Sequence, residues 1–292
     1  MTAHTIRQTR RQKKAFRNAV VAEFPQAQVD SHVVAKNVII GDVATADVIV
    51  SAHYDTPPKL PTWFVKHLVL WGMILVPAVL QGWFMLMFRL PLWVKADIIY
   101  DNLEIYFTAV LVLGYGSMMI YLAHLFGLTP LANKVNLNDN TSGVAVVLDM
   151  AKRLQNNPRY AFVLFDNEEK GLFGSIAFRR KYNDVLKGKR IVVLDCVGLG
   201  DVLNLYTWGA KTDVVSQIET MQDDVALDLK HKRSTIMSMS DHFAFRGLNA
   251  VLMLANYSNK HKRNSLATIH TRKDDNIKPS NLYQVMRLIE NI

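Results

Sequence analysis

The stretch YAFVLFDNEEKGLFGS, Tyr160–Ser175, joins an apolar run to two adjacent glutamates and a glycine-rich turn. The apolar run predicts a buried strand, and the residues GLFGS predict a sharp turn into a helix. Glu168 and Glu169 then lie at the end of a buried strand, where two carboxylates are costly to desolvate unless positive charge compensates them. The stretch therefore indicates an α/β fold and requires a source of positive charge near the two glutamates.

Strands and helices alternate on both sides of this stretch. Helices of 10–15 residues between strands are typical of a mostly parallel or mixed sheet that is covered by helices on both faces, in three layers. The predicted elements are helices at residues 5–24, 140–155, 172–182, 213–221 and 281–292, and strands at residues 32–42, 46–55, 161–165, 190–194, 204–207 and 249–256.

Two long apolar segments interrupt the alternation. Residues 68–88 and 105–128 contain no Asp, Glu, Lys or Arg, and each exceeds the roughly 20 residues that cross a bilayer core. A pair of buried core helices would also explain them, but their length and apolarity favour membrane spans. We predict a transmembrane hairpin in residues 61–128, inserted into one domain built from residues 1–60 and 129–292. The lipid bilayer is then a partner of the chain through both segments.

Charge and cysteine content restrict the remaining function classes. The net charge is +9, but no basic and aromatic residues interleave as in a nucleic-acid-binding module, so we expect no nucleic-acid partner. The basic N-terminal segment is interpreted as attracted to anionic lipid or as a solvated helix. The single cysteine, Cys196, excludes an intramolecular disulfide and is interpreted as a small core residue. No export signal is recognised, and the positive-inside rule places the domain in the cytoplasm, on a two-span membrane protein.

Potential metal ligands follow the apolar strands. His53 and Asp55 end one predicted strand, Glu168 and Glu169 a second, and Asp195 a third. Ligand sites in such sheets form at the carboxyl ends of the strands. Two loops add Asp139 in NLNDNTSG and His270 in ATIHTRKDD.

Each of these signals is weak alone. A His-x-Asp pair is commonly structural, and DNTSG is an ordinary helix-capping turn. Together they gather imidazoles and several carboxylates at one sheet edge, where the acids would repel one another unless divalent cations bind. Imidazole and carboxylate ligands suit zinc and related first-row ions.

At this point the order of motifs resembles a known family. AHYDT, DNTSG, NEEKGLFGS, LDCVG and IHTRKD look like the successive metal-site motifs of the M28 family of zinc aminopeptidases, and NVIIGD and SDHFAFRGLNAVLM resemble that family's early strand and later segment. The resemblance covers residues 33–60 and 129–292. It implies a zinc-exopeptidase-like fold and a metallopeptidase that hydrolyses peptides with a free N-terminus, here in a membrane-anchored form.

The resemblance also implies a role for each residue. Asp139 would bridge two zinc ions, with His53 and Asp195 completing one site and Glu169 and His270 the other. The catalytic residues would be Glu168, as the general base for a metal-activated water, and Asp55, which would accept the other N–H of His53.

Several alternatives stay open at the level of sequence. Asp241 and His242 would either bind polar groups of the substrate or form a buried hydrogen-bonded pair. A glutaminyl-cyclase-like transferase with one zinc and a non-catalytic membrane adaptor with a structural metal site are alternative functions. The complete set of five ligands argues for two metals, and the presence of Glu168 argues against the adaptor.

Overall fold

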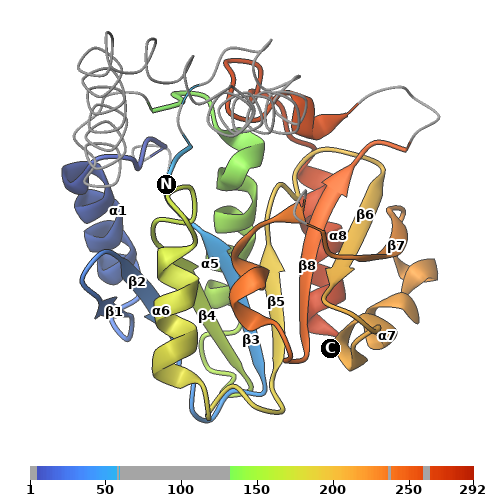
Figure 1. Cartoon of the computed structure of the whole chain (residues 1–292), viewed down its shortest axis with the longest axis horizontal. Helices are drawn as coiled ribbons and strands as arrows, with labels where there is room; N and C mark the ends of the chain where they lie inside the picture. Colours follow the sequence, from blue (N-terminus) through green and yellow to red (C-terminus); the bar gives the residue numbers. More distant parts are fainter. Residues whose placement is uncertain (1–4, 58, 60–131, 236–237, 259–263) are drawn as a thin grey trace, which may run out of the picture. The chain divides into compact units, whose positions relative to one another are not determined.

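A single mixed sheet forms the centre of the computed structural model, which describes residues 5–57, 59, 132–235, 238–258 and 264–292 (Figure 1). Within these residues it has eight strands in the order β1-β2-β4-β3-β5-β8-β6-β7. Their bounds are Gln28–Ser31 (β1), Lys36–Ile40 (β2), Val48–His53 (β3), Tyr160–Phe165 (β4), Arg190–Leu194 (β5), Val202–Thr207 (β6), Asp228–Arg233 (β7) and Ala250–Asn256 (β8).

The four central strands, β4, β3, β5 and β8, are parallel. On one side β2 pairs antiparallel with β4, and on the other β6 pairs antiparallel with β8, so the edges make the sheet mixed. Every residue of β3 and β4 is buried. Strands covered on both faces need apolar side chains at nearly every position, which explains the runs VIVSAH and YAFVLF.

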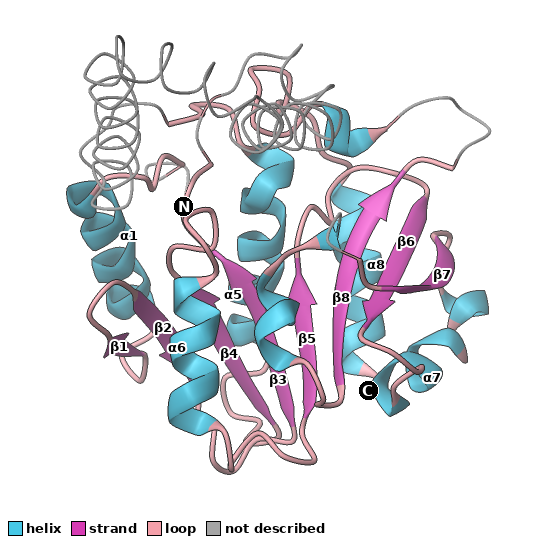
Figure 2. Cartoon of the chain, viewed as in Figure 1, coloured by secondary structure: helices cyan, strands magenta, loops and turns pink. Residues whose placement is uncertain are grey.

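Helices cover both faces of the sheet, which confirms the predicted three-layer α/β class (Figure 2). Phe16, Val147 and Leu288 pack in one core layer, and Phe178 and Phe245 pack in the other. The helices of the first layer are α1 (Arg10–Glu23), α5 (Gly143–Arg153), α7 (Asp213–Glu219) and α8 (Pro279–Glu290); the second contains α6 (Phe173–Tyr182) and the 3-10 helix η6 (Asp241–Phe245).

The parallel register brings the ends of three strands to one edge. His53 is the last residue of β3 and pairs with Phe165 of β4, while Ala52 pairs with Leu194 at the end of β5. The residues that follow β4 and β5 therefore lie beside His53. In open α/β sheets this edge is where ligands bind.

The sequence pattern does not predict two of the strands, β1 and β7. β7, DLKHKR, is an edge strand without fully buried residues, so it lacks the apolar alternation that identifies a strand. β1, QVDS, is a four-residue edge strand with only Asp30 buried. The first helix also begins later than predicted, at Arg10, because Thr9 and Gln12 form a capping box at its start.

The predicted transmembrane hairpin lies outside the described residues. Both apolar segments, 68–88 and 105–128, fall within the undescribed range 60–131, so the hairpin and its domain boundaries stay predictions. In the part of the chain that is described, none of the helices has both the length and the apolar character that crossing a bilayer requires.

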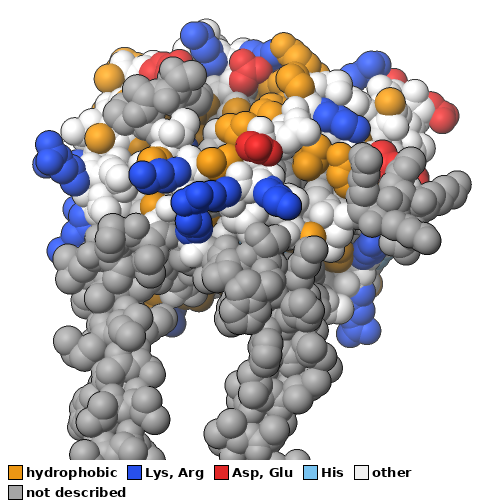
Figure 3. All heavy atoms as spheres, turned by 90° about the horizontal axis from the view of Figure 1, so that it is seen from above, with side chains coloured by type: hydrophobic (Ala, Val, Ile, Leu, Met, Phe, Trp, Pro, Cys, Tyr) orange, Lys and Arg blue, Asp and Glu red, His pale blue; other side chains and the backbone are white. Residues whose placement is uncertain are grey.

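The basic N-terminal segment is not simply a solvated surface. Lysine and arginine side chains are exposed on the face seen in Figure 3. Arg7, Lys13 and Arg17, however, are buried, each less than 9% exposed. For these three residues the interpretation as a lipid-facing or solvated helix is wrong, because their side chains bond to groups inside the domain.

Candidate metal centre

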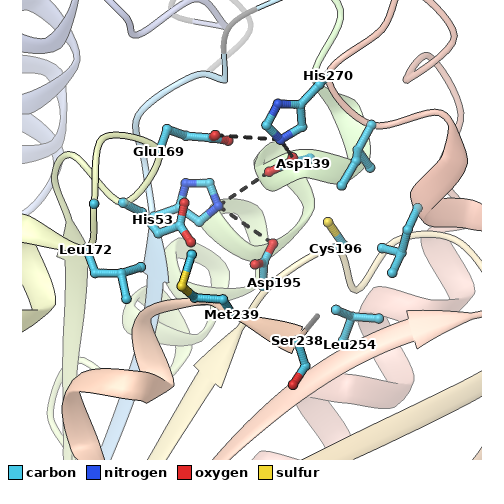
Figure 4. A pocket seen from close by; sticks show the side chains of 14 residues that line it. His53, Asp139, Glu169, Leu172, Asp195, Cys196, Ser238, Met239, Leu254 and His270 are labelled. Atoms are coloured by element: carbon cyan, nitrogen blue, oxygen red, sulfur yellow. Dashed lines mark ion pairs between the residues drawn. The ribbon is translucent and has the colours of Figure 1, made fainter. Parts of the chain in front are cut away.

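The ring of His53 lies between two carboxylates. Its Nε2 atom is 3.4 Å from Oδ1 of Asp139 and 3.6 Å from Oδ1 of Asp195 (Figure 4). His53 comes from β3, Asp195 follows β5, and Asp139 comes from the turn Leu137–Ser142 that leads into α5. One ligand atom of each residue lies within 4.8 Å of the others, so the three could hold a metal ion.

A second group shares Asp139. Its other oxygen, Oδ2, is 3.2 Å from Nε2 of His270, and the same nitrogen is 3.6 Å from Oε2 of Glu169. Asp139, Glu169 and His270 also have ligand atoms within 4.8 Å of one another. The two oxygens of Asp139 thus face two different histidines, one in each group (Figure 4).

Asp55 orders the loop that carries the two glutamates. Its Oδ1 and Oδ2 atoms accept hydrogen bonds from the backbone N–H groups of Glu168 (3.0 Å) and Glu169 (3.3 Å). Its Oδ1 atom also lies 3.6 Å from Nδ1 of His53. Burial alone would raise the pKa of Asp55, but the contacts with His53 and these backbone groups hold it below its usual value.

Asp274 is a residue of the centre that the sequence prediction missed. Its two carboxylate oxygens accept hydrogen bonds from the backbone N–H groups of Asn138 and Asp139, each at 3.0 Å. Burial, with Asp139 nearby, raises its pKa to about 7. The only signal was its place in IHTRKDD, four residues after His270, and a carboxylate that binds backbone has no distinctive spacing.

Negative charge dominates the site. Burial raises the pKa of Glu168 well above its usual value, and Glu169 raises it further. Burial and Asp139 do the same to Glu169. Asp139 itself has a pKa below its usual value, because its contacts with His270 and His53 outweigh its burial. Five carboxylates, those of Asp55, Asp139, Glu168, Glu169 and Asp195, thus gather around two imidazoles.

The donor set fits divalent cations. Oδ1 of Asp195 and Nδ1 of both histidines are buried and have no hydrogen-bond partner among the described residues. Buried polar atoms without a hydrogen-bond partner cost folding free energy, and a ligand bound at the site can offset that cost. Two ligands about 2.0–2.1 Å from a tetrahedral zinc ion lie about 3.4 Å apart, which matches the separations here. Imidazole nitrogen with carboxylate oxygen is a combination typical of zinc sites.

Asp241 and His242 lie outside the two metal groups and do not line the cavity that borders these groups. His242 Nε2 is 2.8 Å from the hydroxyl of Ser234, and its ring stacks on Trp208. Neither carboxylate oxygen of Asp241 accepts a hydrogen bond within the described part of the chain. Burial raises the pKa of Asp241 to about 7, and the hydroxyl of the nearby Ser175 donates to the carbonyl oxygen of Leu172. The two residues are therefore both buried, but they do not form a hydrogen-bonded pair with each other.

A cavity of about 270 Å³ opens beside the two groups. His53, Asp139, Glu168 and Glu169 line one side of it, with Asp195 and His270. The rest of the lining is uncharged and includes Leu172, Cys196, Met239 and Leu254 (Figure 4), together with Leu266 and Ile269. Cys196 also belongs to the core layer of Phe178, as expected for a small core residue, and burial raises the pKa of its thiol.

The chain resembles known proteins in sequence and in fold. The model of peptidase family M28 matches residues 117–292. No curated protein matches the sequence of the chain. A zinc aminopeptidase from Bacillus subtilis is structurally similar, with a TM-score of 0.52 and 19% identity over 87% of this chain and 48% of that one. This chain therefore spans about half the length of that enzyme.

Two further structures cover more of their own length. The LapA aminopeptidase of Legionella pneumophila has a TM-score of 0.57 and 13% identity, over 98% of this chain and 67% of that one. A glutaminyl cyclase from Porphyromonas gingivalis has a TM-score of 0.56 and 16% identity, over 98% of this chain and 92% of that one. At these identities the likeness shows the shared fold.

Proposed function

This chain belongs to peptidase family M28, and on that premise we propose that it is a zinc-dependent exopeptidase that hydrolyses the N-terminal peptide bond of its substrates. The observation that carries the proposal is the position of Asp139. Its two carboxylate oxygens face His53 and His270, and each histidine has a further carboxylate beside it. A carboxylate in that position suits the bridge between two ions.

Five residues would hold the zinc ions. His53, Asp139 and Asp195 would hold one ion, and Asp139, Glu169 and His270 the other. When bound, two zinc ions offset the charge of the carboxylates, lower the pKa of a water from 15.7 toward about 7 and polarise the scissile carbonyl. Asp55 lies 3.6 Å from Nδ1 of His53 and fixes the loop of the two glutamates by accepting hydrogen bonds from their backbone N–H groups.

Glu168 is the residue we assign to proton transfer. It lines the cavity, while its neighbour Glu169 has its carboxylate beside His270. A carboxylate that is free of a ligand role can accept the proton of the attacking water and then donate it to the leaving amine. Glu168 also has ligand atoms near His53 and Glu169, so metal binding by Glu168 is the competing role that substitution would reveal.

The cavity supports a particular kind of substrate. Within the described residues, the rest of the cavity lining includes Leu254, Leu266 and Ile269 and contains no charged side chain. An apolar side chain gains free energy there, at about 25 cal/mol per Å² buried, whereas a charge would be desolvated without a partner. We infer that the enzyme prefers peptides whose N-terminal residue is apolar.

The competing functions differ in measurable ways. The likeness to a glutaminyl cyclase raises the single-zinc transferase as a second candidate. The completeness of both ligand groups supports hydrolysis instead. A non-catalytic adaptor would have no use for Glu168, which neither of the two groups that share Asp139 requires. The hairpin at residues 68–88 and 105–128 would anchor the domain, on the cytoplasmic side, and release of active protein by a carbonate wash without detergent would contradict that anchoring.

The test of function is hydrolysis by zinc-loaded, full-length protein. We expect release of the N-terminal residue from dipeptides and aminoacyl amides, and none from the same peptides after N-acetylation. Chelation should abolish the activity, and zinc should restore it. Conversion of N-terminal glutamine to pyroglutamate without peptide hydrolysis would instead establish the transferase.

A further inference from the structure

The N-terminal residues 5–17 contain three buried cations that the proposed chemistry does not use. Arg7, Lys13 and Arg17 are 2%, 5% and 8% exposed. These residues also lie outside residues 117–292, the part of the chain that the family model matches. Burying a charge is costly unless it is paired and hydrogen-bonded, so the partners of these cations indicate what they do.

Lys13 binds the two residues that precede the glutamates. Its Nζ atom is 2.7 Å from Oδ1 of Asp166 and 2.5 Å from Oδ1 of Asn167. The side chains of Lys13 and Asp166 are 6% and 4% exposed, so solvent screens this pair little. Asn167 has a φ of +58°, a left-handed conformation that costs free energy in most residues other than glycine. Lys13 thus fixes from one side the backbone turn that carries Glu168 and Glu169.

Arg7 binds the loops of two other proposed ligands. Its Nε donates to the carbonyl oxygen of Tyr54, between His53 and Asp55, at 2.5 Å. Its Nη2 donates to the hydroxyl of Thr141, two residues after Asp139, at 3.1 Å. Its backbone pairs with Thr56, donating to Oγ1 at 2.7 Å and accepting from the N–H at 3.2 Å. Arg7 therefore joins the His53 loop to the Asp139 turn.

Arg17 makes a further contact with the His53 loop, at Tyr54. Its Nη1 donates to the hydroxyl of Tyr54 at 2.7 Å, and that hydroxyl donates to the carbonyl of Lys36 at 2.9 Å. Phe16 stacks on the Tyr54 ring, with centroids 5.1 Å apart. The N-terminal segment therefore contacts both the backbone carbonyl and the ring of Tyr54, the residue between His53 and Asp55.

We propose that residues 5–17 are a positioning element for the metal centre and that Lys13 is its positioning residue for Glu168 and Glu169. The inference rests on the metal site of the proposed function. The segment contacts the loops of His53, Asp139 and the glutamates, which lie far apart in sequence. It holds them in place before the ions arrive, so binding loses less conformational entropy. The positive charges of Arg7 and Lys13 also act on Asp55.

The test compares Lys13→Met with Lys14→Met in full-length protein. Lys14 is the exposed neighbour on the same helix and serves as the matched control. Zinc affinity is measured by chelator competition without substrate, and amide hydrogen exchange is measured on zinc-free protein. We expect Lys13→Met to weaken zinc binding about 10-fold, the lower end of the effect of residues that orient metal ligands. We also expect faster exchange at the amides of Glu168 and Glu169, with α8 unchanged and Lys14→Met like wild type.

A second variant separates positioning from general stability. Lys13→Met removes the ion pair of the buried Asp166, whose carboxylate then keeps, among the described residues, only the hydrogen bond from the Lys36 N–H, and this loss destabilises the fold. Lys13→Met/Asp166→Asn removes both charges and should regain thermal stability, yet it should keep the weak zinc binding and the fast exchange. Normal zinc affinity and normal exchange in the folded double variant would overturn the proposal. A wild-type protein without peptidase activity would overturn the proposed function, while the exchange comparison would still decide the role of Lys13.

Discussion

Nε2 of His53 lies 3.4 Å from Oδ1 of Asp139, although the two residues are separated by the long apolar region of the chain. The separation is longer than a good N–H···O hydrogen bond and matches two ligands of one tetrahedral zinc ion. The residues on either side of the apolar region therefore meet at one site.

Replacing Glu168 by Gln should separate catalysis from metal binding. The amide cannot accept a proton, so kcat should fall about 10²–10⁴-fold, the usual contribution of a general base. Zinc content should stay at the wild-type value. Activity assays and metal analysis on the same preparation test this, and a variant as fast as wild type would show that Glu168 is not the general base.

The same substitution one residue later should have a different effect. Glu169→Gln removes the carboxylate 3.6 Å from Nε2 of His270, so the second group should lose its ion. We expect zinc content to fall by about one ion per chain, since a neutral amide is a weaker zinc ligand than a carboxylate. Full zinc content in this variant, with loss of zinc in Glu168→Gln, would exchange the two assignments.

Asp274 should control the affinity for metal without touching it. Its carboxylate accepts the N–H groups of Asn138 and Asp139, and Asp274→Asn would place an amide N–H₂ against one of these donors. We expect zinc affinity to fall about 10–100-fold, as for other groups that orient ligands. Asp275→Asn, at the exposed neighbouring position, is the control. Equal zinc affinities of the two variants would remove Asp274 from the centre.

The N-terminal residue of the substrate should be apolar. Comparing Leu-, Met-, Glu- and Lys-amides, we expect kcat/KM to be about 10- to 100-fold higher for the first two, because Leu254 and Ile269 line the cavity. Leu254→Asp should reduce this preference and favour the Lys-amide. A wild-type protein that prefers the Glu-amide would show that the described cavity does not receive the substrate side chain.

Acid should destabilise the domain through His242. Burial lowers its pKa to about 4, whereas the unfolded chain has a pKa of about 6.5. The unfolded state therefore binds more protons between these values, so stability is complete above about pH 6.5 and falls as the pH decreases toward 4. The loss due to this group is about 3 kcal/mol at most. Thermal unfolding at several pH values should show a flatter dependence in His242→Gln, and identical profiles would contradict this prediction.

Most of the sheet can be predicted from the sequence because its central strands are buried on both faces. The runs that form β3, β4 and β5 contain almost only apolar residues, and the residue type changes abruptly where each strand ends. His53, Glu168 and Asp195 lie at those changes, so parallel pairing alone predicts that they meet. The edge strand β7, DLKHKR, offers no such contrast.

The supporting residues of the site could not be predicted in the same way. Asp274 acts on backbone N–H groups, which every residue but proline has, so nothing in the sequence names its partners. Lys13 lies in a basic helix and Arg7 lies just before it, in a segment whose charge pattern is typical of a solvated surface. Their burial depends on Tyr54, Asp166 and Asn167, which only the folded chain brings to them.

The position of bound zinc tests the central claim most directly. Anomalous diffraction at the zinc edge should show two peaks about 3.5–4 Å apart, the usual spacing of two-metal sites. One peak should lie between His53 and Asp195, the other between Glu169 and His270, with Asp139 touching both. A single peak, or peaks that do not contact Asp139, would contradict the account.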